Sequence, residues 1–254
     1  MSETPPADIV HFFAARTLRL AETAEPPLPR AHQQARDRIW NDKTHGNPGL
    51  FDGPVVACAA IEETDDQTLL LHWVRVTYRH YALRWVPGAT ALPSLFVTVL
   101  QPTLEGTLLT GRMAPSTAAP GRWQLPGGSV DVPPPDEHLD ETALRRNAQR
   151  ELAEEVGIDV SADALRLWAV TRGEHGNIGI HYLAPPQASS DLNDSYSAVA
   201  RAAHAQGMHP EFDKIQYMSS ENDLKSLPAP HVDYLASVMR RFTRECPQGR
   251  SFTR

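Results

Sequence analysis

The sequence predicts a long helix over residues 141–156, and its side-chain pattern constrains how the rest of the chain can pack. Asp140 is a candidate N-cap, and Gly157 stands where a helix commonly ends in the left-handed conformation. At about 100° per residue, apolar side chains one turn apart form a single stripe. They are Leu144, Ala148, Leu152 and Val156. This stripe predicts that one side of the helix packs against a hydrophobic core.

Three glutamates crowd one edge of the apolar stripe. Glu151, Glu154 and Glu155 fall in a sector about 100° wide, and Glu155 lies inside the apolar arc. Like charges one turn apart are destabilising by about 0.2–0.5 kcal/mol, and carboxylates beside a buried face cost more unless they are neutralised. One interpretation is a solvated acidic patch on a surface helix. The other is a site for a hard divalent cation, because Mg²⁺ prefers carboxylate oxygens and commonly binds phosphate oxygens as well.

The segment before the helix favours the second interpretation. In Leu125-Pro-Gly-Gly128 the backbone can approach a ligand closely. Gly-Gly followed by Arg150-Glu-Leu-x-Glu-Glu-x-Gly-Ile158 resembles the signature of the Nudix hydrolases, which cleave nucleoside diphosphates linked to another moiety. The resemblance covers residues 91–243. It implies an α/β fold, an α-β-α sandwich around a mixed sheet, in which the signature forms a loop, a helix and a loop.

Carried over residue by residue, the resemblance implies a site for Mg²⁺ or Mn²⁺. The ligands would be the three glutamates and the carbonyl oxygen of Gly127, and Arg150 would orient the glutamates through an ion pair. A glutamate would accept a proton from the attacking water. Glu151 and Glu155 are the nearest candidates for this base, and Glu211 and Glu174 are candidates outside the helix.

Three further residues are candidates for substrate binding. Arg112 or Arg122 could hold a phosphate oxygen with its guanidinium group, although each could equally be a surface arginine. Trp123 could stack on a base, but its place before Leu125-Pro126 equally suits a packed strand residue.

The loop after Gly128 departs from the Nudix signature. It is enlarged and contains Val132-Pro-Pro-Pro-Asp136. The signature's early glutamate would fall on Thr142, with Glu141 next to it. In the family this glutamate is chiefly structural, so the resemblance does not imply a loss of activity.

Residues 1–90 are expected to form an N-terminal α+β extension of helices and a β-hairpin, with the Nudix domain in residues 91–254. Helical stretches are predicted over 9–20 and 31–40, and strands over 55–61 and 68–78. The segments around Leu50-Phe-Asp-Gly53 and Thr77-Tyr-Arg79 resemble the region before the Nudix fold in the animal UDP-sugar pyrophosphatases of the superfamily. This implies a UDP-sugar substrate, cut to UMP and a sugar 1-phosphate.

Other substrates stay open, because the signature concerns only the diphosphate and the metal. ADP-ribose, a dinucleoside polyphosphate, coenzyme A and an oxidised nucleotide are the alternatives. The aromatic residues of the extension could also be ordinary core residues, which is their commoner role. A different class of function is a non-catalytic sensor of a nucleotide or sugar phosphate. The complete Arg150–Glu155 set argues against a sensor, because a protein that only binds has no need of every carboxylate.

Charge and composition narrow the partners and the location. The formal net charge of −7 disfavours duplex DNA or RNA. No apolar run approaches the roughly 20 residues that a membrane span needs, and the N-terminus does not resemble a secretory signal. Two cysteines, Cys58 and Cys246, are most simply explained by a reducing cytoplasm. The Nudix resemblance implies a small-molecule nucleoside diphosphate derivative as partner, and charge and composition add the expectation of no nucleic acid and no membrane; whether the chain is a homodimer stays open.

Overall fold

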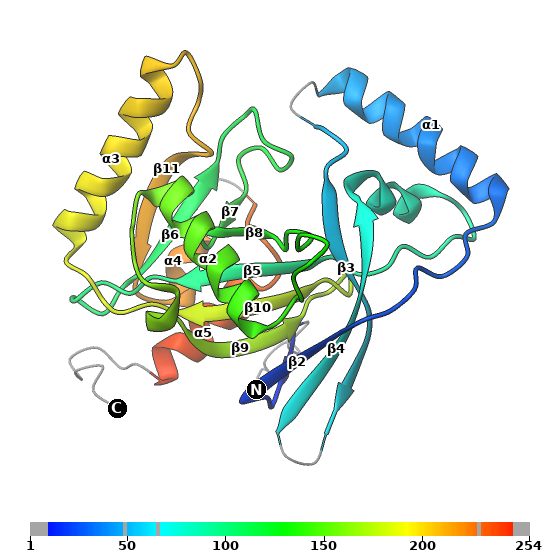
Figure 1. The fold of residues 1–254 in the computed structure, drawn as a ribbon. Helices are drawn as coiled ribbons and strands as arrows, with labels where there is room; N and C mark the ends of the chain where they lie inside the picture. The colour runs from blue at the N-terminus through cyan, green and yellow to red at the C-terminus, as the bar shows by residue number, and fades with distance from the viewer. Residues whose placement is uncertain (1–9, 48–49, 65–66, 228–229, 246–254) are drawn as a thin grey trace, which may run out of the picture.

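A mixed five-stranded sheet forms the centre of the molecule (Figure 1). The computed structural model describes residues 10–47, 50–64, 67–227 and 230–245. The strand order is β1 (His11–Phe13), β9 (Arg166–Arg172), β10 (Ile178–Leu183), β5 (Leu95–Leu100) and β8 (Gly127–Ser129). The β10 and β5 strands are parallel, and the other neighbours are antiparallel.

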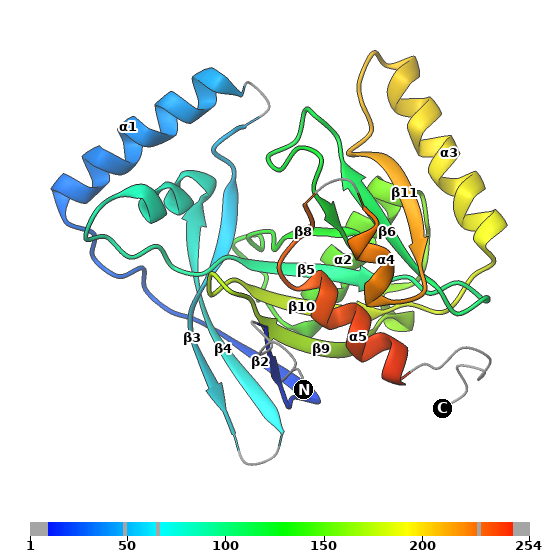
Figure 2. The same ribbon diagram turned by 180° about the vertical axis from the view of Figure 1, so that it is seen from behind.

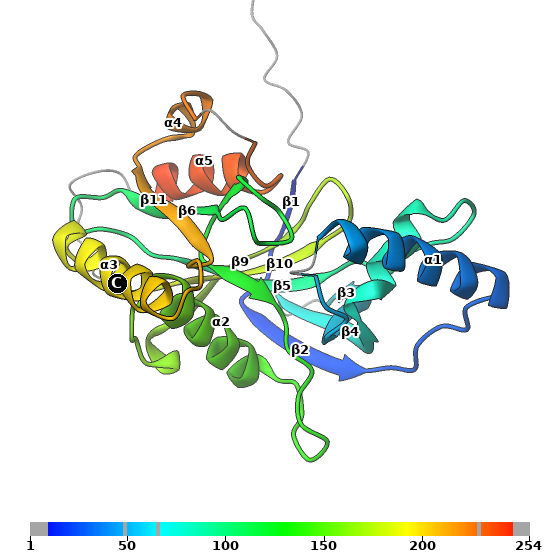
Figure 3. The same ribbon diagram turned by 90° about the horizontal axis from the view of Figure 1, so that it is seen from above.

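Helices cover both faces of this sheet (Figure 3). The α2 helix (Glu141–Val156) lies on one face and the α5 helix (Leu235–Glu245) on the other. Side chains of β5 alternate between the two faces, as the two-residue period of a strand requires. Leu95, Val97 and Val99 pack in the same cluster as the α2 stripe, whereas Leu100 packs with α5. The expected α/β fold, an α-β-α sandwich around a mixed sheet, is confirmed.

The α2 helix has the predicted bounds and the predicted caps. The Oδ1 atom of Asp140 accepts a hydrogen bond from the Ala143 amide at 2.7 Å. Gly157 ends the helix at φ 76°, a conformation that glycine adopts without steric cost. All four stripe residues have an exposed fraction of 0%. The stripe therefore fixes which edge of the helix carries the glutamates.

A second sheet lies beside the central five-stranded sheet. It contains β11 (Phe212–Met218), β6 (Leu108–Met113) and β7 (Trp123–Gln124), and it is followed by α4 (Glu221–Lys225). The α3 helix (Ser189–Ala205) precedes β11 in the chain. Leu125 and Pro126 join β7 to β8, so the chain passes here from the second sheet to the central one. This crossing places the Gly127–Gly128 backbone beside α2.

The N-terminal part forms a third sheet and a helix that project to one side of the body (Figures 1 and 2). The sheet order is β2 (Thr17–Glu22), β4 (Thr68–Thr77) and β3 (Pro54–Glu63). The α1 helix (Arg30–Gly46) packs on the 3₁₀ segment η1 (Tyr78–Trp85). Leu71 and Trp73 of β4 join the same hydrophobic cluster as the α2 stripe.

The helix predicted over residues 9–20 is wrong where the structure describes it. These residues form β1 and β2, because hydrogen bonds to distant strands decide the conformation of such short segments. The β1 strand pairs with β9 and so extends the central sheet. The division of the chain at residue 90 stays a prediction.

Two smaller observations concern the location of the chain. Within the described residues, no helix combines the length and the apolar character needed to cross a bilayer. Cys58 is buried with a free thiol, and Cys246 lies outside the described residues.

Candidate active site

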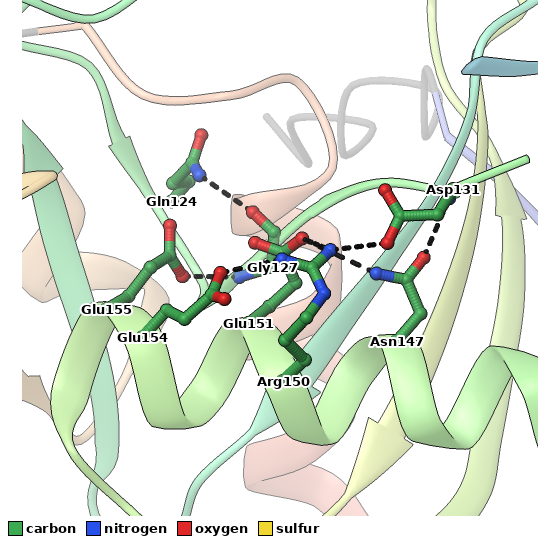
Figure 4. Close-up of polar contacts among 8 residues, drawn as sticks. All are labelled: Gln124, Gly127, Asp131, Asn147, Arg150, Glu151, Glu154 and Glu155. Carbon is green, nitrogen blue, oxygen red and sulfur yellow. Dashed lines mark hydrogen bonds and ion pairs between the residues drawn. The ribbon is translucent and has the colours of Figure 1, made fainter. Parts of the chain in front are cut away.

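The polar side chains of α2 rise from one side of the helix toward the Gly127–Gly128 backbone (Figure 4). Glu151, Glu154 and Glu155 all take part, but their surroundings differ. The Glu154 side chain is 59% exposed and the Glu151 side chain 11%. Glu155 as a whole residue is 1% exposed. Three neighbouring carboxylates therefore span the range from solvent to full burial.

Arg150 is the cation that pairs with this edge of α2. Its guanidinium group donates to Glu154 at 2.6 Å, to Glu151 at 2.7 Å and to Asp131 at 2.7 Å. One positive charge thus faces three carboxylates, so the cluster keeps an excess of negative charge. Of the three glutamates that Arg150 was expected to orient, Glu151 and Glu154 form ion pairs with it, whereas the Glu155 carboxylate contacts the Gly127 amide.

Glu155 lies under the glycine turn. Its Oε2 atom accepts the Gly127 amide hydrogen at 2.7 Å. Its Oε1 atom is buried and has no hydrogen-bond partner among the described residues. Burial, together with the charges of Glu211 and Glu151, raises the pKa of Glu155 well above its usual value. A buried carboxylate oxygen without a partner is costly, which indicates that another group binds it.

Glu151 is the second strongly perturbed carboxyl group. Burial raises its pKa from 4.5 to about 7, and Glu211, Glu154 and Asp131 add to the rise while Arg150 opposes it. The absence of a side chain on Gly128 makes room for this group. A Cβ atom there would lie 2.8 Å from the Glu151 carboxylate, closer than real contacts allow. The second glycine of the pair is therefore needed for the carboxylate to stand where it does.

Gly127 has a different requirement. Its φ is +148°, and an added Cβ would lie 2.1 Å from the Val97 carbonyl oxygen of β5. Its own carbonyl oxygen accepts a hydrogen bond from the Gln124 side chain at 3.4 Å. The turn is thus close to both the sheet and α2, as the sequence predicted for a backbone that approaches a ligand.

Two members of the polar cluster were missed by sequence reasoning. Asn147 accepts from the Asp131 amide at 3.1 Å and donates to Glu151 at 3.4 Å. It stands one turn before Glu151, so the four-residue spacing could have revealed it. Asp131 belongs to the enlarged loop, and no local pattern placed it beside Arg150.

A cleft of about 1090 Å³ opens over the cluster. Arg150, Glu151 and Glu154 line it, together with residues of the loops, of α5 and of the N-terminal part. Glu211 and Glu174 also line the cleft, so both candidate bases outside α2 reach it. Burial and the charge of Glu154 raise the pKa of Glu211 above its usual value. The residue is still exposed to solvent, so the cleft walls desolvate its carboxylate only in part.

The three candidates for substrate binding have different positions in the structure. Arg122 is exposed and lines the cleft. Arg112 does not belong to its lining and instead forms two hydrogen bonds to Asp213, at 2.7 and 3.1 Å. Trp123 is 1% exposed and packs in the cluster of α5. The expectation that its ring stacks on a base is corrected, because a ring enclosed in the core offers no face to a ligand.

Glu141, next to the position of the signature's early glutamate, has a local role. It forms an ion pair with Arg145 one turn along α2. It lies in the first turn of the helix, away from the lining of the cleft.

The residues present fit a hard cation by their chemistry. The site offers carboxylate oxygens, one of them buried without a partner, and an excess of negative charge. Within the described chain, no three His, Cys, Asp or Glu side chains already stand together as a group that could hold a metal ion. In this structure Arg150 forms ion pairs with Glu151 and Glu154.

Comparison with known proteins identifies the family. The Nudix domain model matches residues 92–242, which is more than half of the chain. The chain belongs to the Nudix family and is a Nudix hydrolase. Proteins of this family generally use divalent metal ions and act on small-molecule nucleotide derivatives. No curated protein matches the chain.

The solved structures to which the chain is similar include three that are less than 25% identical to it. MutT protein from Methanosarcina mazei Go1 is 22% identical, with a TM-score of 0.40, over 61% of this chain and 97% of that one. A Nudix hydrolase from Nitrosomonas europaea is 14% identical, with a TM-score of 0.36, over 61% and 91%. A bifunctional NMN adenylyltransferase/ADP-ribose pyrophosphatase from Francisella tularensis, complexed with AMP and a Mn ion, is 17% identical, with a TM-score of 0.41, over 65% and 45%.

Proposed function

We propose that this protein is a metal-dependent pyrophosphohydrolase that cleaves a nucleoside diphosphate linked to another moiety. One observation supports this above the others: the buried Glu155 carboxylate has an oxygen without a partner among the described residues, and it lies under Gly127, which lines the cleft together with Glu151 and Glu154. A divalent cation would stabilise this carboxylate in its charged form, and a diphosphate would share that cation.

The residues that would hold Mg²⁺ or Mn²⁺ are Glu151, Glu154, Glu155 and the carbonyl oxygen of Gly127. A divalent cation there would neutralise the diphosphate and lower the pKa of a water molecule. Arg150 orients the glutamates by the hydrogen bonds that it already makes to Glu151 and Glu154. Arg122, exposed on the cleft wall, would hold a non-reacting phosphate oxygen.

The reaction is attack of water on phosphorus. A new P–O bond forms, the bond from phosphorus to the leaving oxygen breaks, and a carboxylate accepts the proton of the water. Glu211 is the base that we favour, because it reaches the cleft from outside α2 and lies near enough for its charge to raise the pKa of both Glu151 and Glu155. Glu151, Glu155 and Glu174 are the remaining candidates.

The substrate that we propose first is a UDP-sugar, which would give UMP and a sugar 1-phosphate; ADP-ribose is the second candidate. The resemblance of the N-terminal residues supports the UDP-sugar. The N-terminal part also lines the cleft through Phe51 and Tyr78, so it is placed to influence which substrate binds. We propose that residues 1–90 act as an extension of a Nudix domain in residues 91–254.

The test combines product analysis with two substitutions. The protein is incubated with Mg²⁺ and either UDP-glucose or ADP-ribose, and the products are identified by mass spectrometry. We expect Glu154→Gln and Glu155→Gln to lose turnover by orders of magnitude while they remain folded. Glu141→Gln, on the same helix but outside the cleft, is the matched control and should keep turnover. Near-normal hydrolysis by both the Glu154 and the Glu155 variant would remove these glutamates from the mechanism, and nucleotide retention without turnover would indicate a sensor.

A further inference from the structure

Phe51 is an exposed aromatic residue on the wall of the cleft. It is 78% exposed, whereas most large apolar side chains of the N-terminal part pack into the core. Four large apolar side chains in the described chain are strongly exposed, and Phe51 alone among them lines the cleft. The others are Trp85, Leu104 and Met208. A phenyl ring in water at a binding cleft is a site where an apolar surface of a ligand would be stabilised.

The loop that carries Phe51 is held in place by its neighbours. The Asp52 carboxylate accepts the Arg79 amide hydrogen at 2.9 Å and pairs with the Arg79 side chain at 2.9 Å. The Gly53 carbonyl oxygen accepts the Tyr78 amide hydrogen at 2.9 Å. These contacts tie the loop to the start of η1, so the ring is presented from an ordered support.

Gly53 also determines how the ring lies. A Cβ atom on Gly53 would be 2.5 Å from the Cε2 atom of Phe51, so the ring rests against the glycine backbone. One edge of the ring is therefore held close to the backbone, and the residue remains 78% exposed. An exposed aromatic ring held at a cleft is a suitable surface for stacking.

The cleft-lining residues near Phe51 in the sequence are apolar, and this limits which part of a ligand would pack against the ring. Leu50, Gly53, Pro54 and Val55 line the cleft beside the ring. The hydroxyl groups of a sugar would lose hydrogen bonds to water against such a wall, whereas the flat face of a base would not. Arg150, Glu151 and Glu154 of α2 line the same cleft.

We propose that Phe51 stacks on the nucleobase of the substrate, so that the N-terminal extension selects a nucleotide while α2 holds its diphosphate. This inference rests on the proposed function, because it gives the base of the same substrate its binding position. Phe51 touches neither the reacting phosphorus nor the attacking water, and it therefore determines affinity and specificity rather than the chemical step.

Kinetics give the first test. We expect Phe51→Ala to raise KM for the nucleotide substrate about tenfold and to change kcat less than twofold, since stacking on one base has an effect of about this size. Phe51→Trp should restore KM, because it keeps an aromatic face. Trp85→Ala is the matched control: Trp85 is also an exposed aromatic residue of the extension, at 49%, but it does not line the cleft. An unchanged KM for Phe51→Ala would overturn the proposal, and so would an equal effect of Trp85→Ala.

Equilibrium binding gives a test that does not require turnover. Calorimetric titration with UMP, AMP and ribose 5-phosphate, without added metal, compares ligands with and without a base. We expect Phe51→Ala to weaken UMP or AMP binding about tenfold and to leave ribose 5-phosphate unchanged. An equal loss for ribose 5-phosphate would mean that Phe51 contacts the sugar phosphate and not the base. If no nucleotide conjugate is hydrolysed but this pattern appears, the proposed hydrolysis fails while the stacking role of Phe51 stands.

Discussion

Substituting Glu151 by glutamine should stabilise the metal-free protein at high pH, although Glu151 is a proposed metal ligand. Burial raises the pKa of Glu151 from 4.5 to about 7, and its side chain is only 11% exposed. A group whose pKa is higher in the folded state favours folding when protonated. Its contribution is therefore fully present below about pH 4.5 and is lost as the pH rises through about 7. Glutamine keeps the shape and the acceptor oxygen for Arg150 but does not ionise.

The size of the effect follows from the pKa. At about 1.4 kcal/mol per pH unit, the rise from 4.5 to about 7 corresponds to about 3 kcal/mol. The free energy of unfolding of Glu151→Gln, relative to wild type, should therefore rise by about 3 kcal/mol between pH 4.5 and pH 8. Added Mg²⁺ should cancel most of this difference, because a ligand at a hundred times its Kd stabilises the folded wild-type protein by about 2.7 kcal/mol.

Urea unfolding at several pH values between 4.5 and 8, in EDTA and then in Mg²⁺, measures both effects. Glu141→Gln is the control, since this carboxylate pairs with Arg145 at the other end of α2. We expect its difference from wild type to stay constant over the same pH range. A difference between Glu151→Gln and wild type that does not change with pH in EDTA would refute the argument that burial of the charged group destabilises the fold.

Three further predictions concern the glycine turn, the start of α2 and a buried histidine. Gly128→Ala should lower turnover about a hundredfold and change stability by less than about 1 kcal/mol, because its Cβ displaces the flexible Glu151 side chain; steady-state kinetics and urea unfolding check this. Asp140→Ala should lower the free energy of unfolding by about 1 kcal/mol through loss of the N-cap, measured by urea unfolding. Burial and the charges of Arg36 and Arg84 lower the pKa of His80 from 6.5 to about 4, so His80 contributes stability above pH 6.5 that is lost as the pH falls through 4. His80→Gln should reduce this acid-induced loss of stability by up to about 3 kcal/mol. The prediction is contradicted if wild type and His80→Gln lose stability in parallel between pH 6.5 and 4.

The α2 helix was predicted because its signals are local. The cap at Asp140, the end at Gly157 and the four-residue apolar period all depend on residues within one or two turns. The same four-residue period predicted where the glutamates lie on the helix. When the apolar stripe is buried, the edge that carries the glutamates stands beside the core. The segments that became β1 and β2 had no such local signal. Their partners β9 and β4 lie far along the chain, so a helical pattern there was overridden by pairing.

Trp123 and Asp131 show where the prediction of the site failed. Trp123 precedes the glycine pair in sequence, but the passage from β7 to β8 turns its ring into the core of α5. Asp131 follows the pair within the enlarged loop, and only the folding of that loop onto α2 brings its carboxylate to Arg150. Neither outcome can be derived from spacing, because a side chain's direction in a loop depends on what the loop packs against.

The sequence by itself determined a capped helix with one apolar face and three carboxylates beside it, because these properties follow from helical geometry and residue order. Only the tertiary structure decided that Glu155 is enclosed under the Gly127 amide while Glu154 stays in solvent. It also decided that Phe51 stands on a wall of the same cleft. The physical reason is that burial and electrostatic environment come from segments distant in the chain, and these become neighbours only when the sheets and helices pack.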